Sequence, residues 1–325
     1  MMKKIIAVGL VLCAVALAGC ANEEKAKTPS SGSSGVSSVL LSTDNTSNTS
    51  SDTESKIKYT SGDYSYYIVD DGIVITEYHG SGVAHVVIPE TIDGHSVVEL
   101  CGAFERTDIE SVTLPETLKR ITGSPFYRTV VSELHIPKSV EYIDGPFFKS
   151  AHFRSYTVDP ANPHYTAVDG VLFTKDMKTL VSYPECAERT KYAIPEGVET
   201  IGKGAFAYAA WNLKQLTIPS SLKEFEIDSI ATKLEEVNVH ADNPYYCSVD
   251  GVVYNKDVTR VEFYPSGSPR KVWKVPESVR AVTNDAFICI PMNLEEIHVA
   301  ADTYAHLTDD KVSLKHIKVV KDKEK

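Results

Sequence analysis

A short pattern of hydrophobic positions recurs along most of the chain. It reads apolar-x-x-apolar-x-apolar, and clear copies lie at residues 109–114, 213–218 and 294–299. The last two apolar residues of each copy are two positions apart, so their side chains point to the same side of an extended strand. Ten copies occur between residues 83 and 319, and two of them, at Tyr192 and Trp273, lack the first apolar residue. The pattern therefore predicts ten short β-strands.

A second register of apolar positions follows the strands. After Pro195, for example, apolar residues stand three, six and eleven positions later, at Val198, Ile201 and Phe206. Proline cannot donate to a strand ladder and so ends the strand, and the apolar residues that follow are expected to pack inward on the return path. One such coil cannot cover its own apolar face, whereas stacked coils share a continuous core. Six copies of the strand pattern end in proline: Pro89, Pro115, Pro137, Pro195, Pro219 and Pro276.

A longer repeat of 81 residues is superimposed on the short one. Asn162-Pro163 recurs as Asn243-Pro244, and Asp169-Gly170 recurs as Asp250-Gly251. This spacing indicates an internal duplication of blocks at about 153–233 and 234–314. In each block an Asp-Gly turn precedes β-branched and aromatic residues and is followed by a Lys-Asp turn, which predicts an inserted β-hairpin. The predicted hairpin tips are residues 169–176 and 250–257.

These runs resemble a known family. Residues 194–206 and 213–219, the inserted Asn-Pro and Asp-Gly-Val elements, and the opening segment 72–80 are similar to the bacterial surface-antigen (BspA-like) subclass of leucine-rich repeats. The similarity extends over about residues 63–319, and it departs from the family pattern at residues 124–126 and 227–230. It implies a mainly β, right-handed leucine-rich-repeat solenoid of about ten coils, with short helical or irregular returns and two inserted β-hairpins. It also implies a surface protein of the kind associated with adhesion, without implying a ligand, a cofactor or catalytic residues.

The N-terminus has the pattern of an export signal. Lys3 and Lys4 precede an apolar run too short to span a membrane, and the run ends in Leu17-Ala18-Gly19-Cys20. This tetrapeptide is similar to a bacterial lipobox, in which Cys20 would be lipidated; the alternative is an ordinary signal peptide cut near Gly19. We expect a leader at 1–19, a disordered tether at 20–56, where Ser and Thr predominate, and the solenoid at 57–325.

Charge and cysteine content narrow the class of protein. The net charge is −11, and it becomes more negative once Lys3 and Lys4 are removed, which argues against a nucleic-acid partner. The body holds Cys101, Cys186, Cys247 and Cys289, widely spaced and without a CxxC pair. Four buried thiols are the simpler interpretation, and a disulfide among them remains an alternative.

The sequence contains no known catalytic motif and two acidic sets that could concern a metal. The sequence has no HExxH, GxSxG, P-loop or dinucleotide-binding glycine string, so we expect no enzyme and no cofactor. Two acidic sets recur with the duplication, and we interpret them as turn residues, with a calcium site as the alternative. These sets are Asp159, Asp169 and Asp176, and Asp242, Asp250 and Asp257.

The residue between the last two apolar positions of each strand should point outward. Together these residues predict an extended polar row, and solenoids use such surfaces for recognition. We therefore expect a lipid-anchored, extracytoplasmic surface protein that binds a host or envelope protein; the alternative is a structural or scaffolding envelope lipoprotein without a host ligand. Tyrosines on the inserted hairpins could add anchors, although half of them should be core. The candidate binding residues are Thr113, His135, Thr157, Thr217, Asn238, Lys274 and His298.

Overall fold

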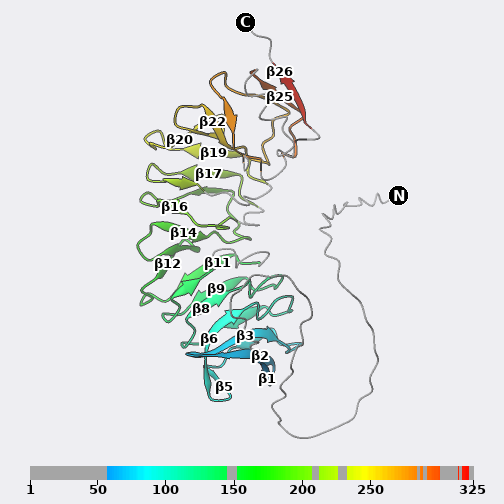
Figure 1. Cartoon of the computed structure of the whole chain (residues 1–325), viewed down its shortest axis with the longest axis vertical. Coiled ribbons are helices and arrows are strands. Elements are labelled where there is room, and N and C mark those ends of the chain that lie inside the picture. Colours follow the sequence, from blue (N-terminus) through cyan, green and yellow to red (C-terminus); the bar gives the residue numbers. More distant parts are fainter. Residues whose placement is uncertain are drawn as a thin grey trace, which may run out of the picture. The chain divides into compact units, whose positions relative to one another are not determined.

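The fold is described from a computed structural model of the chain (Figure 1). The structure describes residues 57–144, 152–206, 212–225, 233–283, 286–287, 291–300, 314 and 317–321. All of them belong to the unit formed by residues 36–325. Within it the strands follow one another along the stack in chain order (Figure 1).

Each of the ten predicted strands forms, and we call them the A strands. They pair in parallel into four short sheets, β4-β7, β9-β11, β15-β17-β19 and β23-β25-β26. The paired apolar residues point into the core; Leu216 and Ile218 of β17, for instance, are fully buried. The A strands are β4 (His85–Val87), β7 (Ser111–Thr113), β9 (Glu133–Ile136), β11 (Ser155–Val158), β15 (Lys191–Ala193), β17 (Gln215–Ile218), β19 (Glu236–Val239), β23 (Val272–Lys274), β25 (Glu296–Val299) and β26 (Lys318–Lys321).

A second set of parallel strands, the B strands, lies on the return path. After β15 the carbonyl of Pro195 accepts a hydrogen bond from the Val198 amide, which closes a turn and leads into the two-residue strand β16. Ile201, six positions after the proline, is its buried residue, so the apolar position predicted to pack inward belongs to a second sheet. The B strands are β6 (His95–Cys101), β8 (Arg120–Thr122), β10 (Tyr142–Ile143), β14 (Thr179–Ser182), β16 (Thr200–Ile201), β18 (Glu224–Phe225), β22 (Arg260–Phe263) and β24 (Ala281–Val282).

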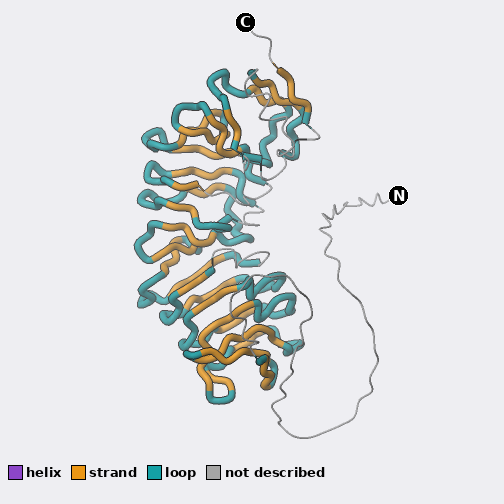
Figure 2. The backbone as a smooth tube through the Cα atoms, viewed as in Figure 1, coloured by secondary structure: helices purple, strands orange, loops and turns teal. Residues whose placement is uncertain are grey.

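Turns and irregular segments complete each coil, and no helix occurs within the described ranges (Figure 2). Aromatic rings of successive coils contact one another. The rings of Phe104 and Phe126 are stacked 5.8 Å apart, and those of Phe126 and Phe153 meet edge to face at 5.7 Å. Phe206 and Phe287, predicted as core, are buried. Phe104, Phe126 and Phe153 belong to one cluster of buried apolar residues, so their rings join successive coils within it.

An antiparallel element covers the first coil. It consists of β1 (Lys58–Ser61), β2 (Tyr64–Val69) and β3 (Gly72–Tyr78), and β3 pairs in parallel with β6. A small hairpin of β5 (Thr91–Ile92) with β6 extends the same coil. Repeat stacks need such terminal caps because the end coil would otherwise expose its core face.

The two inserted elements are larger than the predicted hairpins. Each is a three-stranded antiparallel meander, formed by β12 (Tyr165–Val168), β13 (Val171–Thr174) and β14 in the first block. The second block repeats it with β20 (Tyr246–Val249), β21 (Val252–Asn255) and β22. The middle strand is core, since Val171, Leu172 and Phe173 are fully buried. Residues 169–176 and 250–257 are therefore not free tips; only the Asp-Gly turn and the turn after the middle strand reach the surface.

A buried asparagine joins each meander to the coil before it. Asn162 is fully buried, and its Nδ2 donates to the carbonyls of Pro137 (2.8 Å) and Val140 (3.0 Å). Its Oδ1 accepts from the amides of His164 and Tyr165, both at 2.8 Å. Asn243 makes the same four bonds 81 residues later. The Asn-Pro repeat seen in the sequence is thus a structural joint.

Candidate functional site

The predicted outward residues do form a row on the A strands. His135 pairs with Thr157, and Lys274 pairs with His298. In the longest stretch the order is Ala193, Thr217 and Asn238 on three adjacent strands. The side chains are exposed, except that His298 is half-buried. We call Thr113, His135, Thr157, Ala193, Thr217, Asn238, Lys274 and His298 the outward row.

Several members of the row bond across coils. His135 Nδ1 and Thr157 Oγ1 share a hydrogen bond of 3.0 Å, and Thr113 Oγ1 lies 3.3 Å from Nε2 of His85. His298 Nε2 lies 3.1 Å from a carboxylate oxygen of Glu296. The first two contacts join neighbouring strands, the third lies within β25, and the three do not converge on one point. The arrangement is therefore an extended face and not a pocket.

The last coil departs from the predicted register. β26 pairs so that Lys318 lies beside Glu296, where its Nζ is 3.2 Å from the carboxylate, and Val320 lies beside His298. The sequence pattern had placed Lys318 in the outward row, and the observed pairing is two residues away from it. That prediction was wrong because Val319 and Val320 are both half-buried, so alternation does not fix the strand there.

The row is interrupted twice by the meanders. The carbonyl of Gly170 accepts the Tyr156 amide of β11 at 3.0 Å, and that of Gly251 accepts the Val237 amide of β19 at 2.9 Å. Each Asp-Gly turn thus takes bonds that a further A strand would have made. The sequence could not show this, because it depends on where the meander folds back.

An arginine holds each turn from the other side. The Arg189 guanidinium donates to the carbonyl of Asp169, and it lies 5.4 Å from the ring centre of Tyr192 and 5.8 Å from that of Tyr183. Arg270 donates in the same way to the carbonyl of Asp250. Both arginines were missed in the sequence, although their 81-residue separation was visible there.

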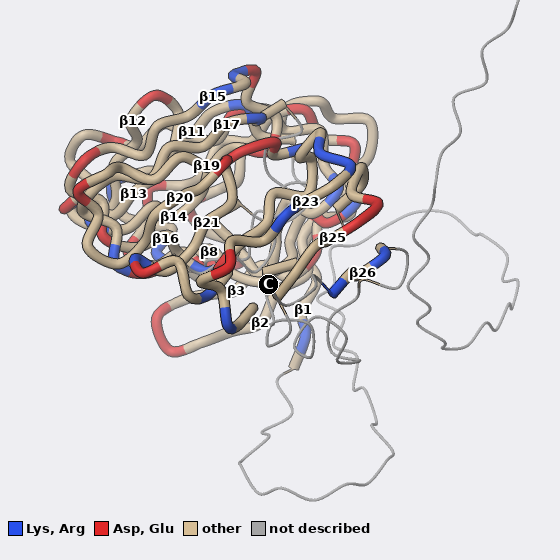
Figure 3. The backbone as a smooth tube through the Cα atoms, turned by 90° about the horizontal axis from the view of Figure 1, so that it is seen from above, with Lys and Arg blue, Asp and Glu red and all other residues tan. Residues whose placement is uncertain are grey.

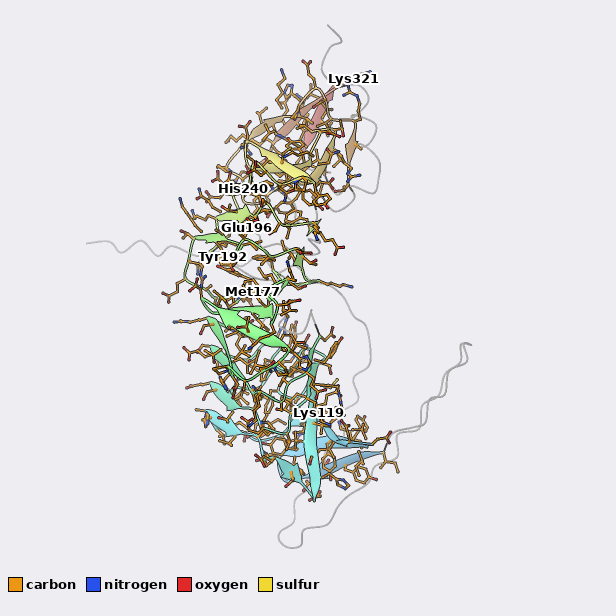
Figure 4. All side chains as sticks on the ribbon, turned by 90° about the vertical axis from the view of Figure 1, so that its left-hand side faces the viewer. Lys119, Met177, Tyr192, Glu196, His240 and Lys321 are labelled. Atoms are coloured by element: carbon orange, nitrogen blue, oxygen red, sulfur yellow. The ribbon has the colours of Figure 1, made fainter. Side chains whose placement is uncertain are left out.

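Several charges on the B side are paired with one another. Arg120 bonds to Asp71 and to Glu99, and with Lys119 it lowers the pKa of the Asp71 carboxyl to about 2. A shallow groove of about 270 Å³ lies here, and its lining includes Asp71 and Lys119. Figure 4 labels Lys119. Further along the stack Glu199 accepts from Lys178 and Lys223 at 2.7 and 2.6 Å.

Several charged side chains on the A strands have no partner among the described residues. The side chains of Glu133, Lys191 and Lys274 are exposed and form no hydrogen bond or ion pair with any described residue. Viewed along the stack, A strands β11, β15, β17 and β19 line one side, and acidic and basic positions are intermixed around the coils (Figure 3). The A side therefore offers free charges of both signs.

The inserted tyrosines contribute little surface. Tyr165, Tyr183, Tyr254 and Tyr264 are buried, and burial raises the pKa of the Tyr183 hydroxyl to about 12. Tyr245 is the exposed member, with 49% of its surface accessible. More of these tyrosines are core than the half expected.

A Ser-His-Glu cluster lies in the N-terminal cap and does not have the geometry of a catalytic triad. Ser65 Oγ lies 2.7 Å from His79 Nε2, and the Glu77 carboxylate lies 3.8 Å from the same nitrogen. A triad needs the acid on the other ring nitrogen and an accessible nucleophile, whereas Ser65 is buried. This cluster is a structural network.

The recurrent aspartates serve turns. Asp159 Oδ1 accepts the Ala161 amide at 2.7 Å. Asp176 Oδ1 accepts the Lys178 amide and the Thr174 hydroxyl, and these bonds lower the pKa of its carboxyl. Across the described part of the chain, no three His, Cys, Asp or Glu side chains are grouped as metal ligands.

The cysteines that the structure describes are free thiols. Cys101, Cys186 and Cys247 are half-buried and unpaired, and burial raises the pKa of the Cys186 and Cys247 thiols. Cys289 lies outside the described residues, as do Cys20, the leader and the tether. In the part of the chain that is described, no helix has the length and apolar character needed to cross a bilayer.

A stack of ten short A strands with a register-aligned polar row defines the class: a leucine-rich-repeat solenoid. A sequence model of the BspA type leucine rich repeat region matches six copies in this chain, over residues 101–232 and 182–307. The chain belongs to this family. The comparison with curated proteins found no match.

Several solved structures are similar to the chain. One is the pneumococcal vaccine antigen PcpA, at 17% identity and a TM-score of 0.39, covering 76% of this chain and 65% of that one. Another is a leucine rich cell surface protein from Faecalibacterium prausnitzii, at 17% identity and a TM-score of 0.44, covering 83% and 96%. A third, from Eubacterium ventriosum, has 17% identity and a TM-score of 0.39, covering 75% and 65%. The chain spans about 65% of the length of the pneumococcal structure.

Proposed function

We propose that this chain is an exported surface protein, lipid-anchored at Cys20, that binds a protein partner through the outward row of its A strands. The observation that carries the proposal is the row itself, which aligns exposed polar side chains over adjacent A strands and has unpaired charges beside it. B-side charges such as Glu199 are neutralised by their neighbours, whereas Glu133, Lys191 and Lys274 on the A side are unpaired. Charges without internal partners keep their full capacity to pair across an interface.

The extended form of the row fits a protein partner better than a small molecule. Small ligands bind in enclosed pockets, whereas protein interfaces are broad and combine polar and charged contacts. Thr217, Asn238 and their neighbours offer a flat, mixed face of this kind. The names of two similar structures, a vaccine antigen and a cell surface protein, agree with surface display.

Binding is tested with a row variant in which His135, Thr217, Asn238 and His298 are changed to alanine together. The chain and the variant are compared by surface plasmon resonance against purified extracellular-matrix proteins and purified envelope proteins. We expect the variant to lose at least tenfold in affinity for the partner. An unchanged affinity in a folded variant would place the site elsewhere, and a partner found among envelope proteins alone would favour a scaffolding role.

A control variant carries the same number of alanine changes away from the row. Thr166, Thr200, Lys203 and Glu224 lie on or beside meander and B strands and are at least partly exposed. Their replacement should leave affinity unchanged. If the control loses as much as the row variant, the loss comes from general surface change and not from the row.

Anchoring is tested separately through Cys20→Ser. We expect the protein to leave the membrane fraction, because two acyl chains supply the stable attachment in the lipobox hypothesis. Cell fractionation with immunoblotting measures the shift. Unchanged membrane retention would refute lipidation at this residue without bearing on the row.

A further inference from the structure

The two Asp-Gly turns that interrupt the outward row are near copies. Asp169 and Asp250 both have φ of 51°, and the glycines that follow have φ of 76° and 75°. The preceding valines, Val168 and Val249, are each 38% exposed. Each turn therefore presents an apolar side chain next to a carboxylate, and we call these two elements the turn knobs.

The knobs are held firmly from two directions. Their glycine carbonyls accept amides of β11 and β19, and their aspartate carbonyls accept the guanidinium groups of Arg189 and Arg270. Adding a Cβ at Gly251 would bring it within 2.5 Å of the Glu236 Cβ, so the turn sits directly on the strand. Because the turns are already ordered, binding a partner would cost little conformational entropy in these loops.

The aspartate side chains take no part in this attachment. The carboxylates of Asp169 and Asp250 are exposed and bond to no described residue. Another Asp-Gly turn of the chain differs: the Asp93 carboxylate accepts the Tyr66 hydroxyl at 2.7 Å and the Ser61 hydroxyl at 2.9 Å. The knob carboxylates are thus available where the Asp93 carboxylate is already used.

The knobs are also separated by a defined distance. The first follows β11, the three strands β15, β17 and β19 come next, and the second knob follows β19. Four layer steps at a strand spacing of about 4.8 Å place the knobs about 19 Å apart. Both lie on the A side, against Ser155 and Glu236, which stand two residues before members of the outward row.

We propose that the two turn knobs are paired docking points for a basic, repetitive polypeptide that presents a cationic side chain beside an apolar one at this spacing. The proposal deepens the proposed function, because it assumes that the A side binds protein. One exposed carboxylate gives a weak contact. Two contacts on one chain make the second binding event intramolecular and raise affinity without any new interaction. The chain's net charge of −11 favours a cationic partner.

The test uses synthetic peptides with two Lys-Leu-Lys heads. A 12-residue Gly/Ser linker has a root-mean-square span of about 19 Å and matches the knobs. In the short-linker peptide a single glycine joins the heads, so the two leucines are four residues apart, about 14 Å at full extension, and both heads cannot seat on the knobs. We expect the long-linker peptide to bind the full chain at least tenfold more tightly than the short-linker peptide or a single head. Isothermal titration calorimetry or fluorescence anisotropy measures the three affinities.

Matched variants assign the gain to the knobs. Asparagine tolerates the same positive φ as aspartate, so Asp169→Asn and Asp250→Asn keep the turn and remove one charge each. Either substitution alone should lower the affinity of the long-linker peptide to that of a peptide with a single head. Asp108→Asn, at an exposed aspartate elsewhere, removes the same charge and should keep the gain. Unchanged melting temperatures show that the variants fold.

Three results would overturn the inference: equal binding of the three peptides, a gain that survives both knob variants, or a gain lost in Asp108→Asn. The row variant separates this inference from the proposed function. If the row variant loses its protein partner while the peptides show no linker dependence, only the paired docking fails. If neither effect appears, both proposals fail.

Discussion

Replacement of the joint asparagine Asn162 by alanine is the most direct test of how the meanders are attached. The side chain uses its full capacity, with two donated and two accepted hydrogen bonds of 2.8 to 3.0 Å, and none of its surface is accessible. Alanine removes all four bonds at once. The carbonyls of Pro137 and Val140 and the amides of His164 and Tyr165 then lose this partner.

The size of the effect follows from the bonds. A net contribution of about 1 kcal/mol for each of four bonds gives a loss of about 4 kcal/mol in the free energy of unfolding. For a domain of this length, 1 kcal/mol corresponds to about 2–4 °C, so the melting temperature should fall by about 8–16 °C. Asn243→Ala should match it, because Asn243 makes the same bonds.

Urea denaturation followed by circular dichroism measures the loss, and calorimetry gives the melting temperature. Asn212→Ala is the control, since the exposed Asn212 donates a single bond, to the carbonyl of Ala187 at 3.1 Å. It should cost no more than about 1 kcal/mol. If Asn162→Ala costs no more than this control, the joint does not hold the meander, and the argument from its four bonds is refuted.

Three further predictions concern the core, a turn and pH. Phe206→Ala and Phe287→Ala should each cost about 3–5 kcal/mol because both rings are buried, and an unchanged melting temperature would contradict that placement. Gly251→Ala should lower the melting temperature clearly, since a Cβ there would lie 2.5 Å from a carbon of the neighbouring strand; Gly62→Ala, with a positive φ but open space, should cost about 1 kcal/mol, and equal losses would contradict the close approach. The Asp71 carboxyl, whose pKa is lowered to about 2, contributes stability that is present above about pH 4 and is lost as pH falls towards 2. Asp71→Asn should therefore flatten this part of the stability profile in acid titration, and an unchanged slope would show that its ion pairs do not contribute.

The A strands could be predicted because their signal is repeated and periodic. Leu216 and Ile218 alternate with Gln215 and Thr217, and the structure places the first pair inside and leaves the second pair accessible. The B strands could not be recognised, since a strand as short as β16 has one buried residue and no alternation. Its Ile201 was correctly expected to point inward, although the sheet it belongs to was not foreseen.

The meanders show a different limit. Val171, Leu172 and Phe173 form an unbroken apolar run, and such a run is typical of a strand buried on both faces. From the sequence, the Asp-Gly turn and the residues after it were predicted to form the tip of a surface hairpin, although this run indicated a buried strand. The outward row was placed correctly on its eight strands and wrongly on β26. Its interruption depends on bonds between distant residues, such as Tyr156 with Gly170, that no local pattern encodes.

The joint asparagines, Asn162 and Asn243, and the carbonyls of Gly170 and Gly251 that end the A-side ladders have a mechanical consequence. The buried apolar residues fall into three clusters, and the boundaries between them lie at the meanders, where the strand ladders of the A side also end. A pulling force applied along the stack would therefore meet bonds of two kinds. Within a segment it meets parallel strand ladders, which continue on the B side where the A-side ladder breaks between β7 and β9. Between segments it meets a few bonds to the joint asparagines and the glycine carbonyls. We expect stepwise extension under load, with breaks at the meanders. Each 81-residue segment begins with its own asparagine joint and its own glycine carbonyl bond, so a further segment could lengthen the molecule without changing its neighbours.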